Sequence, residues 1–425
     1  MSLANNIEFL RNLPKLNGFN GLGDIGRNRR SPVDSPLVET ADFGSNPGAL
    51  RMFSFVPDHR AAVPALVVVL HGCGQTAAGY DLGAGWSTLA RHYGFALLMP
   101  QQQSSNNSNG CFNWFNPEDT ARDSGEACSI RQMIARMELD VGIDGRRVFV
   151  TGLSAGGAMT SVMLATYPEI FAGGAIIAGL PFGVATNMRE ALSGMYQSPS
   201  RPAAELGDLV RNASGHKGPW PKLSVWHGSA DRTVNPANAD EIVKQWLDVH
   251  QLPSEPMSEA EVDGYPRQLW WNADGETVVE SYTITNMAHG TPLGIGDNDE
   301  RYGAQGAFLI EAGISSSYHI ANFFGLTEWV HLAAKDASRE KSREKSRGIS
   351  KETAKQTTRE TTKETTRTTV KTLPPEGAAG LTRALWPLAT PGRRPEPDPA
   401  APPKRAGIDV TAVITRALTA AGLMK

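Results

Sequence analysis

The feature that most constrains the fold is a short apolar run that ends at a glycine, presents one serine and continues as small residues. It spans residues 148–159 and reads Val-Phe-Val-Thr-Gly-Leu-Ser-Ala-Gly-Gly-Ala-Met. A strand, a sharp turn and a helix in this order hold the serine in a strained conformation, and the two flanking glycines avoid collisions with neighbouring elements. The pattern Gly152-x-Ser154-x-Gly156 therefore predicts a serine exposed at the end of a sheet strand.

Around this elbow, residues 49–334 alternate between short apolar runs and segments with helical spacing. Continuous β-branched runs such as 65–70 are typical of strands covered on both faces. Strands that alternate with helices favour an α/β domain with a mostly parallel central sheet and helices on both faces. Besides the elbow, we expect strands at 50–56, 65–70, 95–99, 175–178 and 223–227, a hairpin of 267–271 and 277–285, and helices at 82–93, 129–139, 188–196, 203–211, 236–250 and 316–334.

The remaining segments have a different character. Residues 1–48 are rich in Gly, Asn, Pro and Arg and predict an irregular N-terminal arm, and residues 180–221 predict a lid-like insertion between strands. Residues 335–407 lack bulky apolar residues at regular spacing and predict a disordered basic and Pro-rich linker. Apolar residues return at helical spacing in 408–425, which predicts a short C-terminal helix that docks on the body or on a partner.

Charge is distributed unevenly along the chain. The formal net charge is -3, but residues 335–371 hold 12 Lys and Arg against 6 Asp and Glu, so an acidic body carries a basic tail. This balance does not suggest a nucleic-acid partner, and no window approaches the roughly 18 apolar residues of a membrane span. The first 30 residues lack the uninterrupted apolar stretch of a signal peptide, so we expect a cytoplasmic protein, with an extracellular location as the alternative.

The three cysteines allow at most one disulfide. Cys73 lies in the glycine-rich segment 71–75, where its backbone has another use. Cys111 and Cys128 are therefore the plausible pair, although the sequence leaves open whether they are bonded.

A serine hydroxyl becomes a good nucleophile when a histidine takes its proton and an acid orients that histidine. Behind an elbow of this kind the chain order is serine, acid, histidine, on loops at the carboxyl ends of strands. Asp231 follows the expected strand 223–227, and His289 follows the strand 277–285. We therefore expect Ser154, Asp231 and His289 to form a catalytic triad, with Asp240 as the fallback acid.

The other histidines fit the base less well. His227 precedes the acid, which is the wrong order. Six others lie in expected helices, before the sheet or in the insertion: His59, His92, His216, His250, His319 and His331.

The tetrahedral oxyanion of such a reaction needs two preformed N–H donors. The amide of Ala155 follows the nucleophile at a helix N-terminus, and the glycines around Cys73 let the backbone approach a substrate. We expect the amides of Ala155 and Cys73, or less plausibly Gly74, to form the oxyanion hole. This chemistry requires no metal and no organic cofactor.

Five motifs together resemble the polyhydroxybutyrate (PHB) depolymerase family of esterases, which has the α/β-hydrolase fold. They occur in the family's order within about residues 50–330, and they are His-Gly-Cys-Gly-Gln at 71–75, Cys-Phe-Asn-Trp-Phe at 111–115, the elbow at 152–159, Trp-His-Gly-Ser-Ala-Asp at 226–231 and Met-Ala-His-Gly-Thr-Pro at 287–292. The resemblance implies the same triad and oxyanion hole. It also implies that Trp114 lies near the substrate cleft, with Asn113 as its neighbour.

These observations predict a serine carboxylic-ester hydrolase that acts through an acyl-enzyme. The resemblance implies short-chain polyhydroxyalkanoate esters, as 3-hydroxybutyrate polymer or oligomers, and related domains imply a feruloyl or acetylxylan esterase as the alternative. Unlike the family's secreted enzymes, the chain shows neither a recognisable signal peptide nor an aromatic-rich polymer-binding domain. A hypothesis of another class is an adaptor that contacts polymer granules or a partner through the basic linker and terminal helix.

Overall fold

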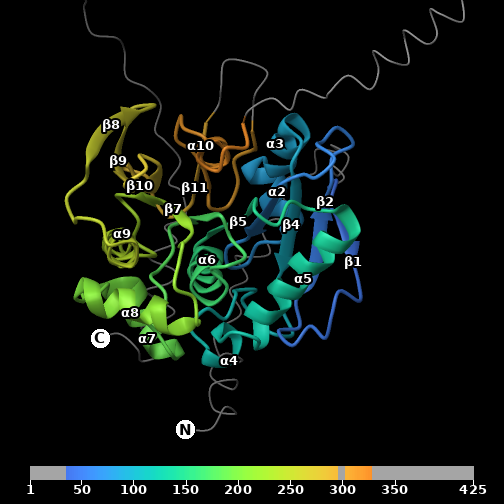
Figure 1. Ribbon diagram of the computed structural model, residues 1–425, viewed down its shortest axis with the longest axis horizontal. Coiled ribbons are helices and arrows are strands. Elements are labelled where there is room, and N and C mark those ends of the chain that lie inside the picture. Colours follow the sequence, from blue (N-terminus) through green and yellow to red (C-terminus); the bar gives the residue numbers. More distant parts are fainter. Residues whose placement is uncertain (1–34, 295–301, 328–425) are drawn as a thin grey trace, which may run out of the picture. The chain divides into compact units, whose positions relative to one another are not determined.

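The computed structural model describes residues 35–294 and 302–327 (Figure 1). Ten strands of this part form one sheet in the order β1-β2-β4-β3-β5-β6-β7-β10-β9-β8. They are β1 (Val38–Thr40), β2 (Arg51–Phe55), β3 (Leu66–Leu70), β4 (Ala96–Gln101), β5 (Val148–Leu153), β6 (Gly173–Ile177), β7 (Lys222–Gly228), β8 (Ser258–Val262), β9 (Tyr265–Trp271) and β10 (Thr277–Ile284). Two short strands, β11 (Thr291–Leu293) and β12 (Leu309–Glu311), pair separately.

The centre of the sheet is parallel, as the alternation of strands and helices predicts. Strands β4, β3, β5, β6, β7 and β10 run in one direction, and β1, β2, β8 and β9 complete the edges through antiparallel pairs. Since parallel strands end at the same edge, the segments after β3, β5, β7 and β10 all leave from the carboxyl edge of the sheet. Ligands of open α/β sheets bind at this edge.

Strand β3 shows why the central runs are continuously apolar. Successive side chains of a strand point to opposite faces, so Leu66, Val68 and Leu70 join one core, whereas Val67 and Val69 join the other. All five side chains are fully buried. Helices therefore cover both faces, which agrees with the expected fold class.

The first core is covered by α5 (Gly125–Val141), α6 (Ala155–Thr166) and α9 (Ala237–His250), and the second by α3 (Trp86–Tyr93) and α10 (Ser316–Phe323) (Figure 1). The expected insertion holds α7 (Met188–Gln197) and α8 (Ala203–Ala213), close to the predicted bounds. The short helix α4 (Pro117–Thr120) precedes α5.

Local structure departs from the sequence prediction at several places. The single helix expected at 82–93 is two helices, α2 (Ala77–Ala84) and α3, because Gly85 between them adopts a left-handed φ of 78°. Strand β1 lies within the arm that was expected to be irregular, where it pairs with β2 at the sheet edge. Strand β8, whose residues are mostly exposed and polar, carries no apolar alternation that predicts it.

The remaining predictions concern residues outside the described part. These are residues 1–34 of the expected N-terminal arm, residues 328–334 of the helix expected at 316–334, the linker at 335–407 and the terminal helix at 408–425. In the part that the structure describes, the helix that begins at Ser316 ends at Phe323, so its expected continuation through residues 324–327 is wrong. Within the described residues, no helix is long and apolar enough to cross a membrane.

Candidate functional site

Ser154 lies in a strained turn between β5 and α6, at the carboxyl edge of the sheet. Its φ of 58° and ψ of -118° are rare for a residue with a side chain. The conformation is held on both sides, because the Ser154 amide donates to the Ile177 carbonyl at 2.9 Å and its carbonyl accepts from the Ala158 amide at 2.8 Å. The serine is only half-buried, whereas the β5 residues before it are fully buried.

The two glycines of the elbow are required by close backbone approach. A Cβ atom on Gly152 would lie 2.4 Å from the Gly156 carbonyl oxygen, and one on Gly156 would lie 2.3 Å from the Leu70 carbonyl oxygen. Both distances are well inside van der Waals contact, so any side chain would separate α6 from β5 or β3. The predicted reason for the Gly152-x-Ser154-x-Gly156 pattern is thus confirmed.

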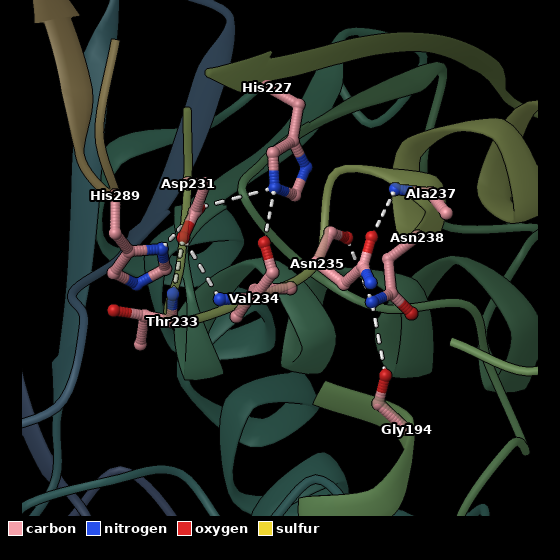
Figure 2. Close-up of polar contacts among 9 residues, drawn as sticks. All are labelled: Gly194, His227, Asp231, Thr233, Val234, Asn235, Ala237, Asn238 and His289. Carbon is pink, nitrogen blue, oxygen red and sulfur yellow. Dashed lines mark hydrogen bonds and ion pairs between the residues drawn. The ribbon is translucent and has the colours of Figure 1, made fainter. Parts of the chain in front are cut away.

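The structure brings Asp231 and His289 together, although they follow different strands. His289 Nδ1 lies 2.6 Å from Asp231 Oδ2, and both side chains are almost fully buried (Figure 2). The turns that carry them are bonded to each other, since the Ala230 amide donates to the Met287 carbonyl at 3.0 Å. Because an ionised Asp231 can only accept a hydrogen bond, Nδ1 of His289 carries the proton and donates it to the carboxylate. The second ring nitrogen, Nε2, is then the one that can accept a proton.

Asp231 is held as a carboxylate by donors around both oxygens. Its Oδ1 accepts from the amides of Thr233 at 2.8 Å and Val234 at 2.9 Å (Figure 2). Burial by itself would raise the pKa of Asp231, but the hydrogen bonds from His227 and His289 outweigh it and hold the pKa well below its usual value. The acid is therefore charged at any pH near neutrality.

His227 is the site residue that sequence reasoning set aside. Its Nε2 lies 3.2 Å from Asp231 Oδ2, so the carboxylate lies between two imidazoles (Figure 2). The available signal was its position four residues before the acid at the end of a buried strand. Chain order bears on His227 only as a base, and it excludes that role.

The expected oxyanion loop lies directly after β3. Most of its amides have partners within the protein: Gly72 donates to Gln75 Oε1 at 2.9 Å, Gly74 to the Asn109 carbonyl at 2.9 Å and Gln75 to the Gly72 carbonyl at 3.2 Å. These bonds fix the loop and engage the Gly74 amide. On the other side of the elbow, Ala155 is the first residue of α6, where helical geometry leaves amides without an intrahelical acceptor.

The expected pairing of Cys111 with Cys128 is wrong. Cys73 and Cys111 form the disulfide, and Cys128 is free and partly buried in α5. The error came from assigning the glycine loop to catalysis alone. The bond joins the loop after β3 to the loop after β4, so the side chain of Cys73 has a structural role.

The aromatic segment 111–115 is organised by a buried carboxyl that the sequence did not reveal. Glu126 Oε1 accepts from Asn113 Nδ2 at 2.8 Å and from Gln102 Nε2 at 2.6 Å, and its Oε2 accepts from the Asn113 amide at 2.9 Å. Burial raises the pKa of Glu126 to about 8, and the nearby Asp119 adds to this effect. The structure therefore directs the Asn113 amide toward Glu126, and Trp114, only 8% exposed, packs in the core beside Phe115.

The segment that follows Asp231 also contacts the insertion at 180–221. Asn238 Nδ2 donates to the Gly194 carbonyl at 3.1 Å, and the Asn235 amide donates to the Met195 carbonyl at 2.7 Å (Figure 2 shows the first of these). Helix α7 is thus fastened to the turn that carries Asp231. Among the residues described, no group of three or more His, Cys, Asp or Glu side chains could hold a metal ion.

Comparisons with known proteins identify the family of the chain. The family model described as esterase PHB depolymerase matches residues 54–254. The chain is 48% identical over 291 residues to poly(3-hydroxyalkanoate) depolymerase C of Paucimonas lemoignei, which covers 68% of this chain and 70% of that protein. It is 34% identical over 263 residues to an acetylxylan esterase of Coprinopsis cinerea, covering 60% of this chain and 69% of the relative.

A solved structure gives the same result for the fold. The acetyl xylan esterase from Aspergillus awamori superposes with a TM-score of 0.58 at 25% sequence identity. The match covers 68% of this chain and 99% of that one, so the resemblance extends over the whole of the smaller enzyme.

Proposed function

Because the chain belongs to the PHB depolymerase family of esterases and is a carboxylic-ester hydrolase, we propose that Ser154, Asp231 and His289 are its catalytic triad. The observation that carries this assignment is the 2.6 Å contact between Asp231 and His289 at the edge where the strained serine elbow ends β5. A serine, a histidine and a buried carboxylate at one edge of such a sheet are the parts that acyl transfer requires.

The proposed reaction proceeds in two halves. His289 Nε2 takes the proton of Ser154 Oγ as the oxygen attacks the ester carbonyl, and Asp231 stabilises the imidazolium that forms. The tetrahedral intermediate collapses to an acyl-enzyme, and the alcohol leaves with the proton from His289. Water then attacks the acyl group by the same route in reverse, which releases the acid and restores Ser154.

The amides of Ala155 and Cys73 are proposed to bind the oxyanion. The start of α6 offers the first donor, and its helix dipole favours negative charge there. In the loop after β3, the amides of Gly72, Gly74 and Gln75 donate to other protein groups, which favours Cys73 over Gly74 as the second donor.

The substrate class is proposed as short-chain polyhydroxyalkanoate esters. The support is the 48% identity to a poly(3-hydroxyalkanoate) depolymerase, against 34% to an acetylxylan esterase. The second candidate is the hydrolysis of plant-cell-wall esters, acetylated xylan or feruloyl esters. Asn113 and Trp114 stay predictions as substrate contacts, because the structure shows them packed against Glu126 and Phe115.

A side-by-side assay tests this choice. The purified protein should hydrolyse 3-hydroxybutyrate oligomers with a higher kcat/KM than acetylated xylan or methyl ferulate, measured by release of acid at constant pH. Ser154→Ala protein serves as the blank for uncatalysed hydrolysis. A higher kcat/KM on ferulate or acetylated xylan would reject the polyester as the substrate.

The disulfide bears on the compartment. Disulfides persist in oxidising surroundings and are rare in the cytosol, so the Cys73–Cys111 bond favours an extracellular location over the cytoplasmic one expected from the N-terminal sequence. The bond also ties the loop that carries the Cys73 amide to the loop at 111–115. We therefore propose that the disulfide holds the Cys73 amide in position for the oxyanion hole.

Breaking the disulfide should lower kcat without unfolding the protein. We expect a Cys73→Ser and Cys111→Ser double variant to lose on the order of tenfold in kcat, below the ~10²–10³ of a lost oxyanion donor, because Gly74 still bonds to Asn109. Cys128→Ser is the matched control and should leave kcat unchanged. Peptide mapping without reductant should find Cys73 linked to Cys111, and a Cys111–Cys128 peptide would contradict that pairing. An unchanged kcat in the double variant would contradict the proposed support of the oxyanion hole by the disulfide.

A further inference from the structure

His227 is the one histidine of β7 and is buried beside the proposed acid, with 3% of its surface exposed. Its Nε2 lies 3.2 Å from Asp231 Oδ2 and 3.0 Å from the Val234 carbonyl oxygen. Its Nδ1 is buried, and no partner for it is found among the described residues. The ring thus touches the acid from the side opposite His289 (Figure 2).

These contacts determine which ring nitrogen carries the proton. A carboxylate oxygen and a carbonyl oxygen both accept hydrogen bonds, so Nε2 between them must be the donor. A proton on Nδ1 would be a buried donor without an acceptor, which is unfavourable. The contacts of His227 therefore favour the tautomer that carries its proton on Nε2.

The same bonds close a ring around the carboxylate. Val234 donates its amide to Asp231 Oδ1 at 2.9 Å, while its carbonyl accepts from His227, whose Nε2 also faces Asp231 Oδ2. Rotation of the carboxyl group would break bonds to both oxygens at once. The orientation of Oδ2 toward His289 is consequently set before any substrate binds.

We propose that His227 is a positioning residue of this active site, a second imidazole that fixes Asp231 and shares its negative charge with His289. The inference rests on the proposed function of Asp231 as the triad acid. His227 touches neither the serine nor the substrate, and it acts only through the carboxylate. A hydrogen bond from His227 to the carboxylate spreads its negative charge, which limits how strongly Asp231 favours the protonated form of His289.

Few other charged groups face this cluster. The end of β7 contributes His227, the turn after it Asp231, and the segment after β10 His289. Helix α9 contributes Asp240, an exposed residue that interacts electrostatically with His227. The ring of Phe308, at 5.7 Å between centroids, packs against His289 on another side and carries no charge.

Two substitutions separate positioning from packing. His227→Phe keeps the ring volume but removes the donor, whereas His227→Gln keeps an N–H near the position of Nε2. With His227→Phe we expect kcat to fall about 10- to 100-fold with little change in KM, as for the loss of a hydrogen bond to a charged group. The acid limb of the kcat/KM profile should move to higher pH, because the full charge of Asp231 then favours protonated His289.

The Gln variant should restore most of kcat and return the acid limb toward its wild-type position. His250 provides the matched control, since its Nε2 contacts the Pro221 carbonyl at 3.1 Å, far along α9 from the acid. His250→Phe should leave the acid limb where it is. Equal losses in the Phe and Gln variants, or an acid limb that does not move in His227→Phe, would overturn the inference.

A measurement on the wild-type protein holds even if the Phe variant does not fold. Nitrogen-15 NMR of labelled histidines should show His227 as the Nε2–H tautomer at neutral pH. An Nδ1–H tautomer or an imidazolium at His227 would overturn the inference. Failure of the proposed function looks different, because Ser154→Ala protein would then retain ester hydrolysis.

Discussion

Ser154→Ala should abolish ester hydrolysis while leaving the fold intact. We expect kcat for p-nitrophenyl butyrate to fall on the order of 10⁴- to 10⁶-fold, because no other group can form the acyl-enzyme. Alanine keeps the Cβ atom that already occupies the strained turn, and the backbone bonds to Ile177 and Ala158 do not involve the hydroxyl. The circular dichroism spectrum and the melting temperature should therefore match those of the wild type.

Ser161 supplies the matched control for this substitution. It lies in α6, is fully buried, and donates its hydroxyl to the Leu180 carbonyl at 2.7 Å. Ser161→Ala should cost about 1 kcal/mol of stability through that lost hydrogen bond and leave kcat unchanged. A fluorophosphonate probe should label wild-type protein at Ser154 and leave Ser154→Ala protein unlabelled. Turnover retained by Ser154→Ala would reject the proposed nucleophile.

The fold and the arrangement of the elbow could be predicted because local sequence determines them. Continuous apolar strands such as 65–70 leave few alternatives to a sheet covered on both faces. The glycines flanking Ser154 indicate a close backbone contact that any side chain would prevent. The meeting of Asp231 with His289 followed from the same logic, since strands of one direction end at one edge. These features depend on residues close to one another in sequence or on the sheet topology.

Features that depend on contacts between distant loops could not be predicted in this way. The pairing of Cys73 with Cys111 requires the loops after β3 and β4 to meet, and three cysteines alone do not distinguish the possible pairs. Glu126 looks like an ordinary polar residue of a helix, yet it holds the loops at 102–113 from inside the protein. The position of His227 in the chain order excludes it as the base, but chain order does not indicate which side chains lie beside an acid.

Asp231→Asn should be almost as damaging as loss of the serine. The asparagine retains the shape of the carboxyl group, but its amide no longer provides the charge that stabilises protonated His289 or selects the Nδ1–H tautomer. We expect kcat to fall about 10⁴-fold at neutral pH, with a smaller change in KM, as for a triad that keeps its geometry and loses its acid. Because the pKa of Asp231 is held well below its usual value, the wild-type acid stays ionised throughout such an assay, and the loss cannot come from its titration.

Asp240 makes the comparison decisive, because it is the other acid that the sequence allows in this role. It lies in α9 with its side chain exposed, and it has no hydrogen bond to His289, whose Nδ1 is bonded to Asp231. Asp240→Asn should therefore keep kcat within about twofold of wild type, as for a surface charge that touches neither the reacting groups nor the base. A large loss of kcat in Asp240→Asn, together with an active Asp231→Asn enzyme, would show that Asp240 is the triad acid in place of Asp231. The buried carboxylate with donors on both oxygens, and not the exposed one, has the environment that keeps a charge fixed next to a histidine.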